Sequence, residues 1–294
     1  MDTHFLESFV AVAELGSIAE AARRLDLTAS AVSQRIGALE AEMNIELVSR
    51  SGRTVLPTPA GTALLPEAKK VLQAISNLRL LAAEGTIWGD FKIGVFTSAL
   101  TGFFPPILEK LIEDLPNVDF FLVRAASDDL YPQLLRSELD AAIVIKPNFA
   151  LPKSVDWIGL RKEALIAITP EHVSERDIGK LLSDHKFIRY DRNNWGGRIA
   201  NRFLEDRGLK PMERLELDSL EAIAVLVDRG LGISIIPDWA PPWPEGLRLN
   251  KIVLDTKDYA RDIGIVWPRA SPKMAIIETF VKHARAICEL KQCA

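Results

Sequence analysis

GSIAEAARRLDLTASAVSQRI, residues 16–36, carries the start signals of two successive helices. Ser17 and Glu20 have the spacing of a capping box, in which each side chain bonds the backbone N–H of the other residue. The helix that begins there meets a short turn at residues 26–27, and Thr28 is a favourable N-cap for the next helix. Two short helices joined by a tight turn predict a helix-turn-helix.

The second of these helices has two different faces. Its apolar stripe consists of Val32, Ile36 and Leu39. The opposite face collects small, uncharged residues at the spacing i, i+3, i+4, i+7, namely Ser30, Ser33, Gln34 and Gly37. In a helix-turn-helix the N-terminal part of this helix enters the major groove of DNA, where Ser and Gln side chains can bond base edges. The face therefore favours DNA recognition.

The segments on either side complete a winged helix-turn-helix. Residues 5–14 have the periodicity of an amphipathic helix, and residues 45–56 form two short apolar runs around Ser51-Gly52-Arg53. We expect a hairpin there with arginines near its tip, which would contact phosphates. The net charge does not argue for DNA, because residues 1–60 hold five arginines and eight acidic residues. A three-helix bundle with a hairpin and no DNA role has the same periodicity.

A long helix follows the hairpin. Thr58 is an N-cap before Pro59 at the first helical position, and Pro66 is expected to kink the first turns. A single apolar stripe runs along residues 59–83, through Leu64, Ala68, Val71, Leu72, Ile75, Leu78 and Ala82. Such a stripe needs a partner, either its own domain or a second copy of the chain. Gly85 and Gly89 bracket an expected hinge.

From residue 91 onward strands and helices alternate. We expect strands at 91–96, 118–123, 141–145, 165–168, 187–190, 215–217, 233–236 and 263–267. The helices between and after them are expected at 99–113, 130–136, 196–207, 219–229 and 273–289. This alternation predicts parallel sheets covered by helices. The predicted architecture is an N-terminal all-α winged helix-turn-helix followed by a two-lobed α/β domain of the periplasmic-binding-protein type.

Composition narrows the function classes. The chain has 294 residues, a net charge of −4 and no apolar run that could span a membrane, so we expect a cytoplasmic, multi-domain protein that does not bind membranes. Its two cysteines, Cys288 and Cys293, fit neither a metal cluster nor a redox pair, and its four histidines match no metal spacing. The residues around Gly232 lack the last glycine of a nucleophile elbow and of a dinucleotide fingerprint. We therefore expect no enzyme activity, no metal and no cofactor.

The stretch 16–36 resembles the LysR family of transcriptional regulators. The likeness continues through Leu39-Glu40, Leu47, Arg50 and Ala60-Gly61, and then through residues 116–118, 139–143 and 227–237. It implies a DNA-binding head at 1–58, a dimerisation helix and hinge at 59–88, and an effector-binding domain at 89–294. The first lobe would hold 89–161 with 268–294, and the second lobe 162–267. The resemblance also implies double-stranded DNA, a homodimer or homotetramer, a small-molecule effector and RNA polymerase as partners. The chain departs from the family pattern at Ala29 and Gln34, which are expected to contact bases. The DNA sequence preference of relatives therefore cannot be transferred to this chain.

Two sets of site residues follow. The predicted DNA contacts are Thr28, Ala29, Ser30, Ser33, Gln34, Arg35, Arg50 and Arg53. In open α/β sheets ligands bind beyond the carboxyl ends of strands, at helix N-termini. Residues at such places, where the family's effector cleft also lies, are Thr97, Ser98, Ala99, Thr101, Ser127, Lys146, Tyr190, Arg192 and Asn193.

The two cations among these residues suit an anionic effector, although Ser98 alternatively caps a helix and either cation alternatively forms a surface salt bridge. The alternative function is a solute-binding or small-molecule-processing α/β protein whose N-terminal helices serve only assembly. Salt-sensitive binding to duplex DNA distinguishes the two functions.

Overall fold

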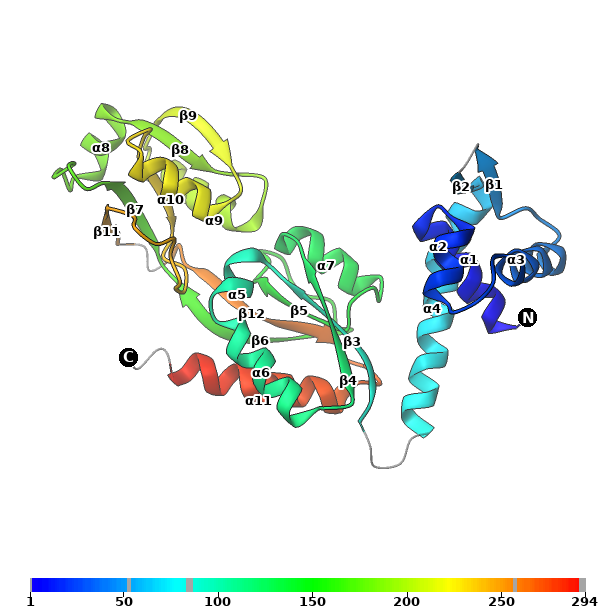
Figure 1. Ribbon diagram of the computed structural model, residues 1–294. Coiled ribbons are helices and arrows are strands. Elements are labelled where there is room, and N and C mark those ends of the chain that lie inside the picture. Colours follow the sequence, from blue (N-terminus) through cyan, green and yellow to red (C-terminus); the bar gives the residue numbers. More distant parts are fainter. Residues whose placement is uncertain (1, 52–53, 83–86, 256–257, 291–294) are drawn as a thin grey trace. The chain divides into compact units, whose positions relative to one another are not determined.

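The computed structural model describes residues 2–51, 54–82, 87–255 and 258–290. The chain divides into two compact units, Met1–Thr86 and Ile87–Ala294 (Figure 1). Within the described residues, no helix is both long and apolar enough to cross a membrane. Arg53, Gly85 and Cys293, which the sequence analysis singled out, lie outside these residues.

The first unit is a winged helix-turn-helix with a long helix after it. Its elements are α1 (Thr3–Leu15), α2 (Ile18–Arg24), α3 (Ala29–Met43), β1 (Val48–Ser51), β2 (Thr54–Pro57) and α4 (Pro59–Ala82). The predicted caps are present: Ser17 accepts from the N–H of Glu20 at 3.3 Å, and Thr28 accepts from that of Ala31 at 3.1 Å. The Glu20 carboxylate pairs with Arg23. The helix-turn-helix predicted from residues 16–36 is thus confirmed.

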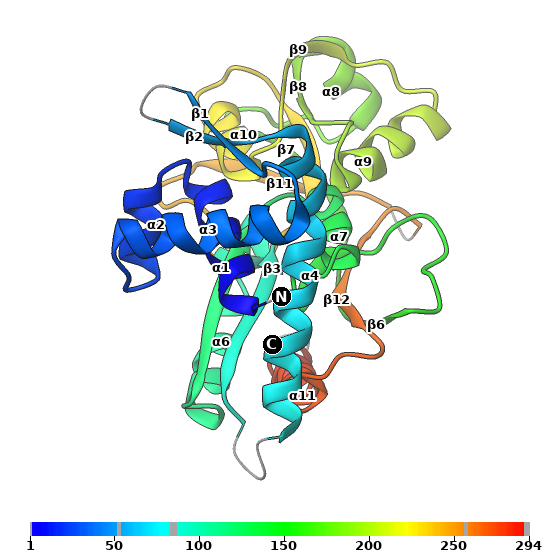
Figure 2. The same cartoon turned by 90° about the vertical axis from the view of Figure 1, so that its right-hand side faces the viewer.

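The first lobe of the second unit is a five-stranded sheet in the order β4-β3-β5-β12-β6. Its elements are β3 (Gly89–Val95), α5 (Thr97–Thr101), α6 (Phe104–Asp114), β4 (Val118–Arg124), α7 (Ser127–Leu135), β5 (Ala141–Ile145), β6 (Val155–Glu163), β12 (Arg261–Pro268) and α11 (Met274–Leu290). Helices α6 and α11 pack on one face of the sheet, and α7 packs on the other (Figures 1 and 2). Cys288 is buried in the core on the α11 side.

The second lobe repeats this plan. Its elements are β7 (Leu165–Pro170), α8 (Ile178–Asp184), β8 (Lys186–Tyr190), α9 (Trp195–Asp206), β9 (Met212–Leu217), α10 (Leu220–Asp228), β10 (Ser234–Pro237) and β11 (Leu249–Val253). One sheet has the order β10-β7-β11 and the other pairs β8 with β9. A parallel bridge between Phe187 and Ile233 connects the two sheets. The α/β architecture with two lobes agrees with the sequence prediction, but the sheets are not all parallel as expected: β7 pairs antiparallel with β10 and β11, and β12 pairs antiparallel with β5 and β6.

The structure corrects three details of that prediction. Residues 261–267 were assigned to the second lobe, but β12 pairs with β5 and β6 in the first-lobe sheet. The single helix expected at 99–113 is two helices, because the chain turns at Gly102, where a Cβ would lie 2.7 Å from the Ser98 carbonyl oxygen. The elements β6, α8 and β11 were not predicted, since they are short or mix charged with apolar residues.

Candidate nucleic-acid interface and interlobe cavity

Helix α3 presents its small polar face to solvent. Val32, Ile36 and Leu39 are buried against α1 and α2, as their spacing predicts. On the other side Thr28, Ala29, Ser30 and Gln34 are exposed, while Ser33 and Arg35 are half-buried. The structure therefore brings six of the eight predicted DNA contacts together around the first turns of one helix.

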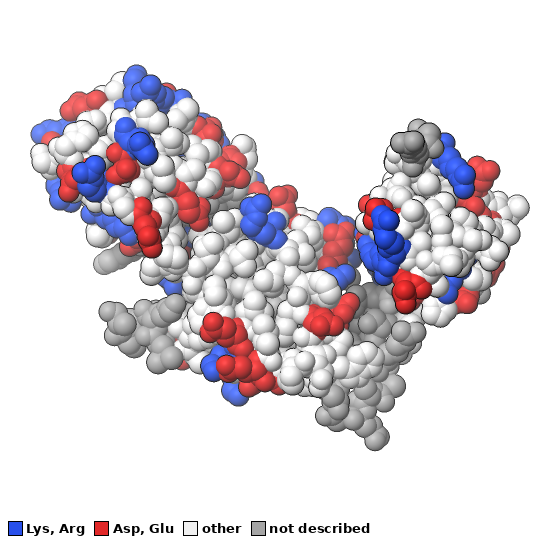
Figure 3. Space-filling model, in the orientation of Figure 1, with Lys and Arg blue, Asp and Glu red and all other residues white. Residues whose placement is uncertain are grey.

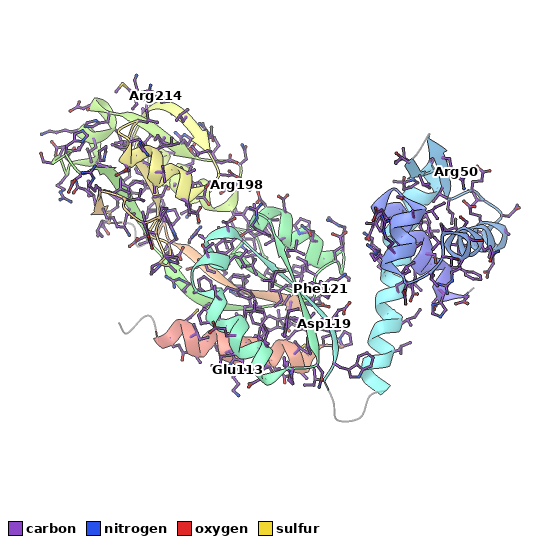
Figure 4. All side chains as sticks on the ribbon, viewed as in Figure 1. Arg50, Glu113, Asp119, Phe121, Arg198 and Arg214 are labelled. Atoms are coloured by element: carbon purple, nitrogen blue, oxygen red, sulfur yellow. The ribbon has the colours of Figure 1, made fainter. Side chains whose placement is uncertain are left out.

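The wing is tied to α3 by a carboxylate. Glu40 Oε1 accepts from the backbone N–H groups of Leu47 at 2.7 Å and Val48 at 3.1 Å. Arg50 is exposed on β1, opposite Val55 in the hairpin (Figure 4). Glu40 thus sets the position of the wing relative to the recognition face. In the sequence Glu40 stands out only as part of the family pattern, which predicts no such role for it.

The junction between the wing and α4 depends on Thr58 and Gly61. The Thr58 hydroxyl donates to the Glu46 carbonyl at 2.8 Å and accepts from the Gly61 N–H at 3.0 Å. A Cβ on Gly61 would lie 2.0 Å from the carbonyl oxygen of Leu47. Only glycine lets α4 approach this loop so closely.

The apolar stripe of α4 divides between two environments. Ala68 is buried, and Leu64 and Leu72 pack against the same cluster, which includes Leu6 and Phe9 of α1. Val71 and Leu78, seven positions apart on the helix, are 41% and 65% exposed. The first half of the stripe therefore packs on its own unit, and Val71 and Leu78 remain available to another surface.

A cavity of about 350 Å³ lies between the two lobes. Helices α7, α9 and α10 all begin at it, so the positive ends of three helix dipoles lie beside it. Its lining residues are Phe96, Thr97, Ser98, Arg124, Ala125, Ala126, Ser127, Asp129, Ile145, Tyr190, Asn194, Trp195, Gly196, Asp218, Ser219, Leu220, Glu221 and Arg261.

Four predicted effector residues line this cavity: Thr97, Ser98, Ser127 and Tyr190. The other five lie elsewhere among the described residues. Ala99 is fully buried, and Thr101 bonds the Thr97 carbonyl. Lys146 lines a second cavity of about 100 Å³ with Arg198 and Arg202.

Arg192 and Asn193 have partners of their own outside the cavity. Arg192 pairs with Glu216 at 2.9 Å and with Glu213 at 2.5 Å, and Asn193 bonds Asp191. Hydrogen bonds from Arg189 and Arg192 hold the pKa of Glu213 below its usual range. The charge of Arg192 is therefore used within the second lobe.

A buried ion pair lies beside the cavity, which Arg261 lines. Arg261 Nε donates to Glu163 Oε2 at 3.0 Å, and both side chains are 2% exposed. Arg261 Nη2 donates to the Ser98 hydroxyl at 3.1 Å, and Glu163 Oε1 accepts from the N–H of Ala240 at 3.1 Å. Burial alone would lower the pKa of Arg261, but the charge of Glu163 raises it. The pair links Ser98 of the first lobe to the chain that follows β10.

Sequence reasoning missed five charged residues of the cavity. They are Arg124, Asp129, Asp218, Glu221 and Arg261. Asp218 and Glu221 flank the start of α10, and Arg124 and Arg261 lie at strand ends, which are the places where a search of strand–helix junctions would find them. Within the described ranges, His, Cys, Asp and Glu form no group of three that could hold a metal.

Two family models match the chain. Residues 3–62 match "Bacterial regulatory helix-turn-helix protein, lysR family", and residues 85–289 match "LysR substrate binding domain". The HTH-type transcriptional regulator CzcR of Bacillus cereus is 30% identical over 244 residues, which cover 82% of this chain and 81% of that protein. GltR of Bacillus subtilis, also an HTH-type transcriptional regulator, is 28% identical over 238 residues, covering 81% and 80%.

Solved structures share the whole fold. A full-length OxyR variant from Pseudomonas aeruginosa superposes with a TM-score of 0.73 at 23% identity, covering 97% of this chain and 95% of that one. Full-length CbnR in complex with its target DNA gives a TM-score of 0.69 at 20% identity, covering 98% and 100%. At these identities the likeness shows the fold.

Proposed function

The chain belongs to the LysR family of transcriptional regulators, and from this premise we propose that α3 and the wing bind a specific inverted-repeat DNA site under the control of an effector bound between the two lobes. The family consists of DNA-binding regulators with an effector-binding domain, not of enzymes. The observation that carries the proposal is the exposed, small polar face of α3 beside the wing.

The proposed contacts divide into two kinds. Ser30, Ser33 and Gln34 read base edges, because a small uncharged face can enter the major groove and Gln pairs bidentately with adenine. Arg35, Arg50 and Arg53 bind phosphates, which orient the protein without reading sequence. Arg24 pairs with Glu14 at 2.9 Å and is not part of this set.

We expect Gln34→Ala and Arg50→Ala to weaken DNA binding in different ways. Loss of a bidentate base contact costs about 1–3 kcal/mol and relaxes sequence preference at one position. Loss of a phosphate contact weakens binding to all duplexes alike and reduces the dependence of log K on log salt by about one unit. Titrating both variants against one series of duplexes at several salt concentrations separates the two effects. If Gln34→Ala and Arg50→Ala had the same salt slope and the same sequence preference, the proposed division of roles would be contradicted.

We propose that the protein works as a homodimer or homotetramer, and two surfaces support this. The first is α4 with exposed Val71 and Leu78. The second consists of the two edge strands, β4 with exposed Phe121 and β9 with exposed Leu215. The α6 surface near β4 is mainly acidic (Figure 3), with Glu109, Glu113 and Asp114 on α6 and Asp119 on β4, while Arg198 on α9 and Arg214 on β9 lie in the second lobe (Figure 4), where α9 and β9 carry both signs of charge. Exposed apolar residues on these edge strands suit pairing of β4 with β9 of another copy.

Leu78→Glu is expected to shift the protein toward the monomer, because it places a charge in the apolar surface that a second α4 would cover. Sedimentation at a series of protein concentrations measures the dissociation constant. Lys70→Gln, an exposed change on the same helix, is the control and should leave the association unchanged. An unaltered oligomeric state in Leu78→Glu would show that α4 is not the interface.

Three hydroxyls support an effector with an anionic group. Ser98 Oγ accepts from Arg261 at 3.1 Å, Ser127 Oγ accepts from the N–H of Ile145 at 3.0 Å, and Thr97 Oγ1 accepts from Arg124 at 3.4 Å. Because each oxygen already accepts a bond, each O–H proton can donate to a ligand. Three donors beside a cationic Arg124 suit a carboxylate or a similar anion.

Binding of this effector between the lobes would act through their closure. A regulator switches when its effector binds one arrangement of the protein more tightly than another, and the size of the switch equals that difference in affinity. A changed arrangement of the effector domains would change the spacing of the paired α3 helices on DNA and, through it, contact with RNA polymerase.

A further inference from the structure

The two walls of the interlobe cavity differ in hydrogen-bonding character. The first-lobe wall offers the donors of Thr97, Ser98, Ser127 and Arg124 described above. The second-lobe wall at the start of α10 carries the carboxylates of Asp218 and Glu221. A ligand that fills the cavity therefore meets mainly donors on the first-lobe wall, where Asp129 is the one carboxylate among the lining residues, and two carboxylates on the second-lobe wall.

Only one of the two carboxylate oxygens of Glu221 has a hydrogen-bond donor among the described residues. One oxygen, Oε2, accepts from the Ser219 hydroxyl at 3.3 Å, and the Ser219 oxygen in turn accepts from the N–H of Ala222. The other oxygen, Oε1, is buried and has no hydrogen-bond partner among the described residues. A buried carboxylate oxygen without a donor is costly, and a donor supplied by a ligand would remove that cost.

The cations of the cavity do not balance these carboxylates. The charge of Arg261 is matched by Glu163, which also lies 3.2 Å from Arg161. Arg124 is on the opposite wall, beside Thr97. Asp129, from the first turn of α7, adds a further negative charge to the lining. An effector that is only an anion would meet repulsion from Asp129, Asp218 and Glu221.

We infer that the effector carries a protonated amine as well as an anionic group, as an amino acid does, with the amine held by Glu221 and Asp218. The inference rests on the proposed role of the cavity as the effector site. The cavity volume of about 350 Å³ suits a small compound of this kind. One molecule then bonds both lobes through groups of opposite charge, and this gives it a higher affinity for the closed arrangement.

The test uses the intact protein and matched pairs of probes. The thermal unfolding midpoint is measured with each of the common L-amino acids and with the 2-hydroxy acid that has the same side chain, in which a hydroxyl replaces the amine. We expect at least one amino acid to raise the midpoint by several degrees and its 2-hydroxy acid to have little effect. Calorimetric titration then gives the affinity of that amino acid.

Glu221→Gln should weaken the binding of that amino acid about tenfold or more, because a charged hydrogen bond is lost while the side-chain shape is kept. Asp218→Asn provides a second variant should Glu221→Gln fold poorly, and Glu245→Gln, an exposed change in the second lobe, should leave the affinity unchanged. Equal binding of the 2-hydroxy acid, unchanged affinity in Glu221→Gln and Asp218→Asn, or no response to any amino acid would overturn the inference.

The proposed DNA-binding function is tested separately from the inference about the amine. Duplex binding by the same protein preparation is measured without any probe, so its failure would remove the DNA role while leaving the ligand result intact. Conversely, 2-hydroxy acids that bind while amino acids do not would leave an anionic effector in place and remove only the amine.

Discussion

Glu163→Gln is expected to lower the free energy of unfolding of the second unit by about 3–5 kcal/mol, because it leaves the buried guanidinium of Arg261 without its counter-charge. Both side chains are almost completely buried, so water cannot replace the lost carboxylate. The same change weakens the hydrogen bond from the Ala240 N–H to Glu163 and removes the ion pair between Glu163 and Arg161. It therefore affects Arg261 in the cavity lining and the strands β6 and β12 that connect the lobes.

Denaturant unfolding followed by tryptophan fluorescence measures this loss. All six tryptophans lie at residue 88 or later, so the signal reports the second unit alone. Glu245→Gln is the matched control, since Glu245 is exposed in the same lobe. The double variant Glu163→Gln with Arg261→Met should be more stable than the sum of the two single changes predicts, because it removes both charges together. A loss below about 1 kcal/mol would show that the pair is not structurally important.

Gly61→Ala is the second change with a large expected effect. Its Cβ would lie 2.0 Å from the Leu47 carbonyl oxygen, so either α4 or the loop before the wing must move. Overpacking of this kind costs typically 1–3 kcal/mol, and contact with rigid backbone places Gly61→Ala at about 3 kcal/mol. Because Glu40 fixes the same loop to α3, we also expect weaker DNA binding.

Hydrogen exchange of the amides in α1 and α3 reports the stability of the first unit, which contains no tryptophan. Gly37→Ala is the control, because a Cβ at that helical position meets nothing within 4 Å. It should raise stability by about 0.5–1 kcal/mol through the ordinary preference of helices for alanine. Equal exchange in Gly61→Ala and the wild-type protein would contradict the close approach of α4 to the loop.

The sequence predicted most of what depends on local pattern. The caps at Ser17 and Thr28, the apolar stripe of α3 and its polar face are set by spacing within one helix, so they were found without knowledge of the tertiary structure. The membership of β12 in the first-lobe sheet was not predicted, because a strand of residues 261–268 carries no local sign of which sheet it joins.

The cavity was only partly predictable for the same reason. Thr97, Ser98 and Ser127 follow strand ends, and the general rule for α/β sheets located them. Arg192 satisfied that rule too, but its charge is paired with Glu213 and Glu216 on β9. Glu163 and Arg261 meet across 98 positions of the chain, and no pattern within either segment indicates the other.

The most direct test of the regulator is the binding of the purified protein to duplex DNA from upstream of its own coding sequence, measured over a series of salt concentrations. We predict saturable binding at a discrete site, about 10³-fold or more tighter than binding to random duplex at the same salt. The affinity should fall steeply as salt rises, because phosphate contacts release counterions. Folded protein that binds this DNA no more tightly than random duplex would contradict the proposed role of α3 and the wing.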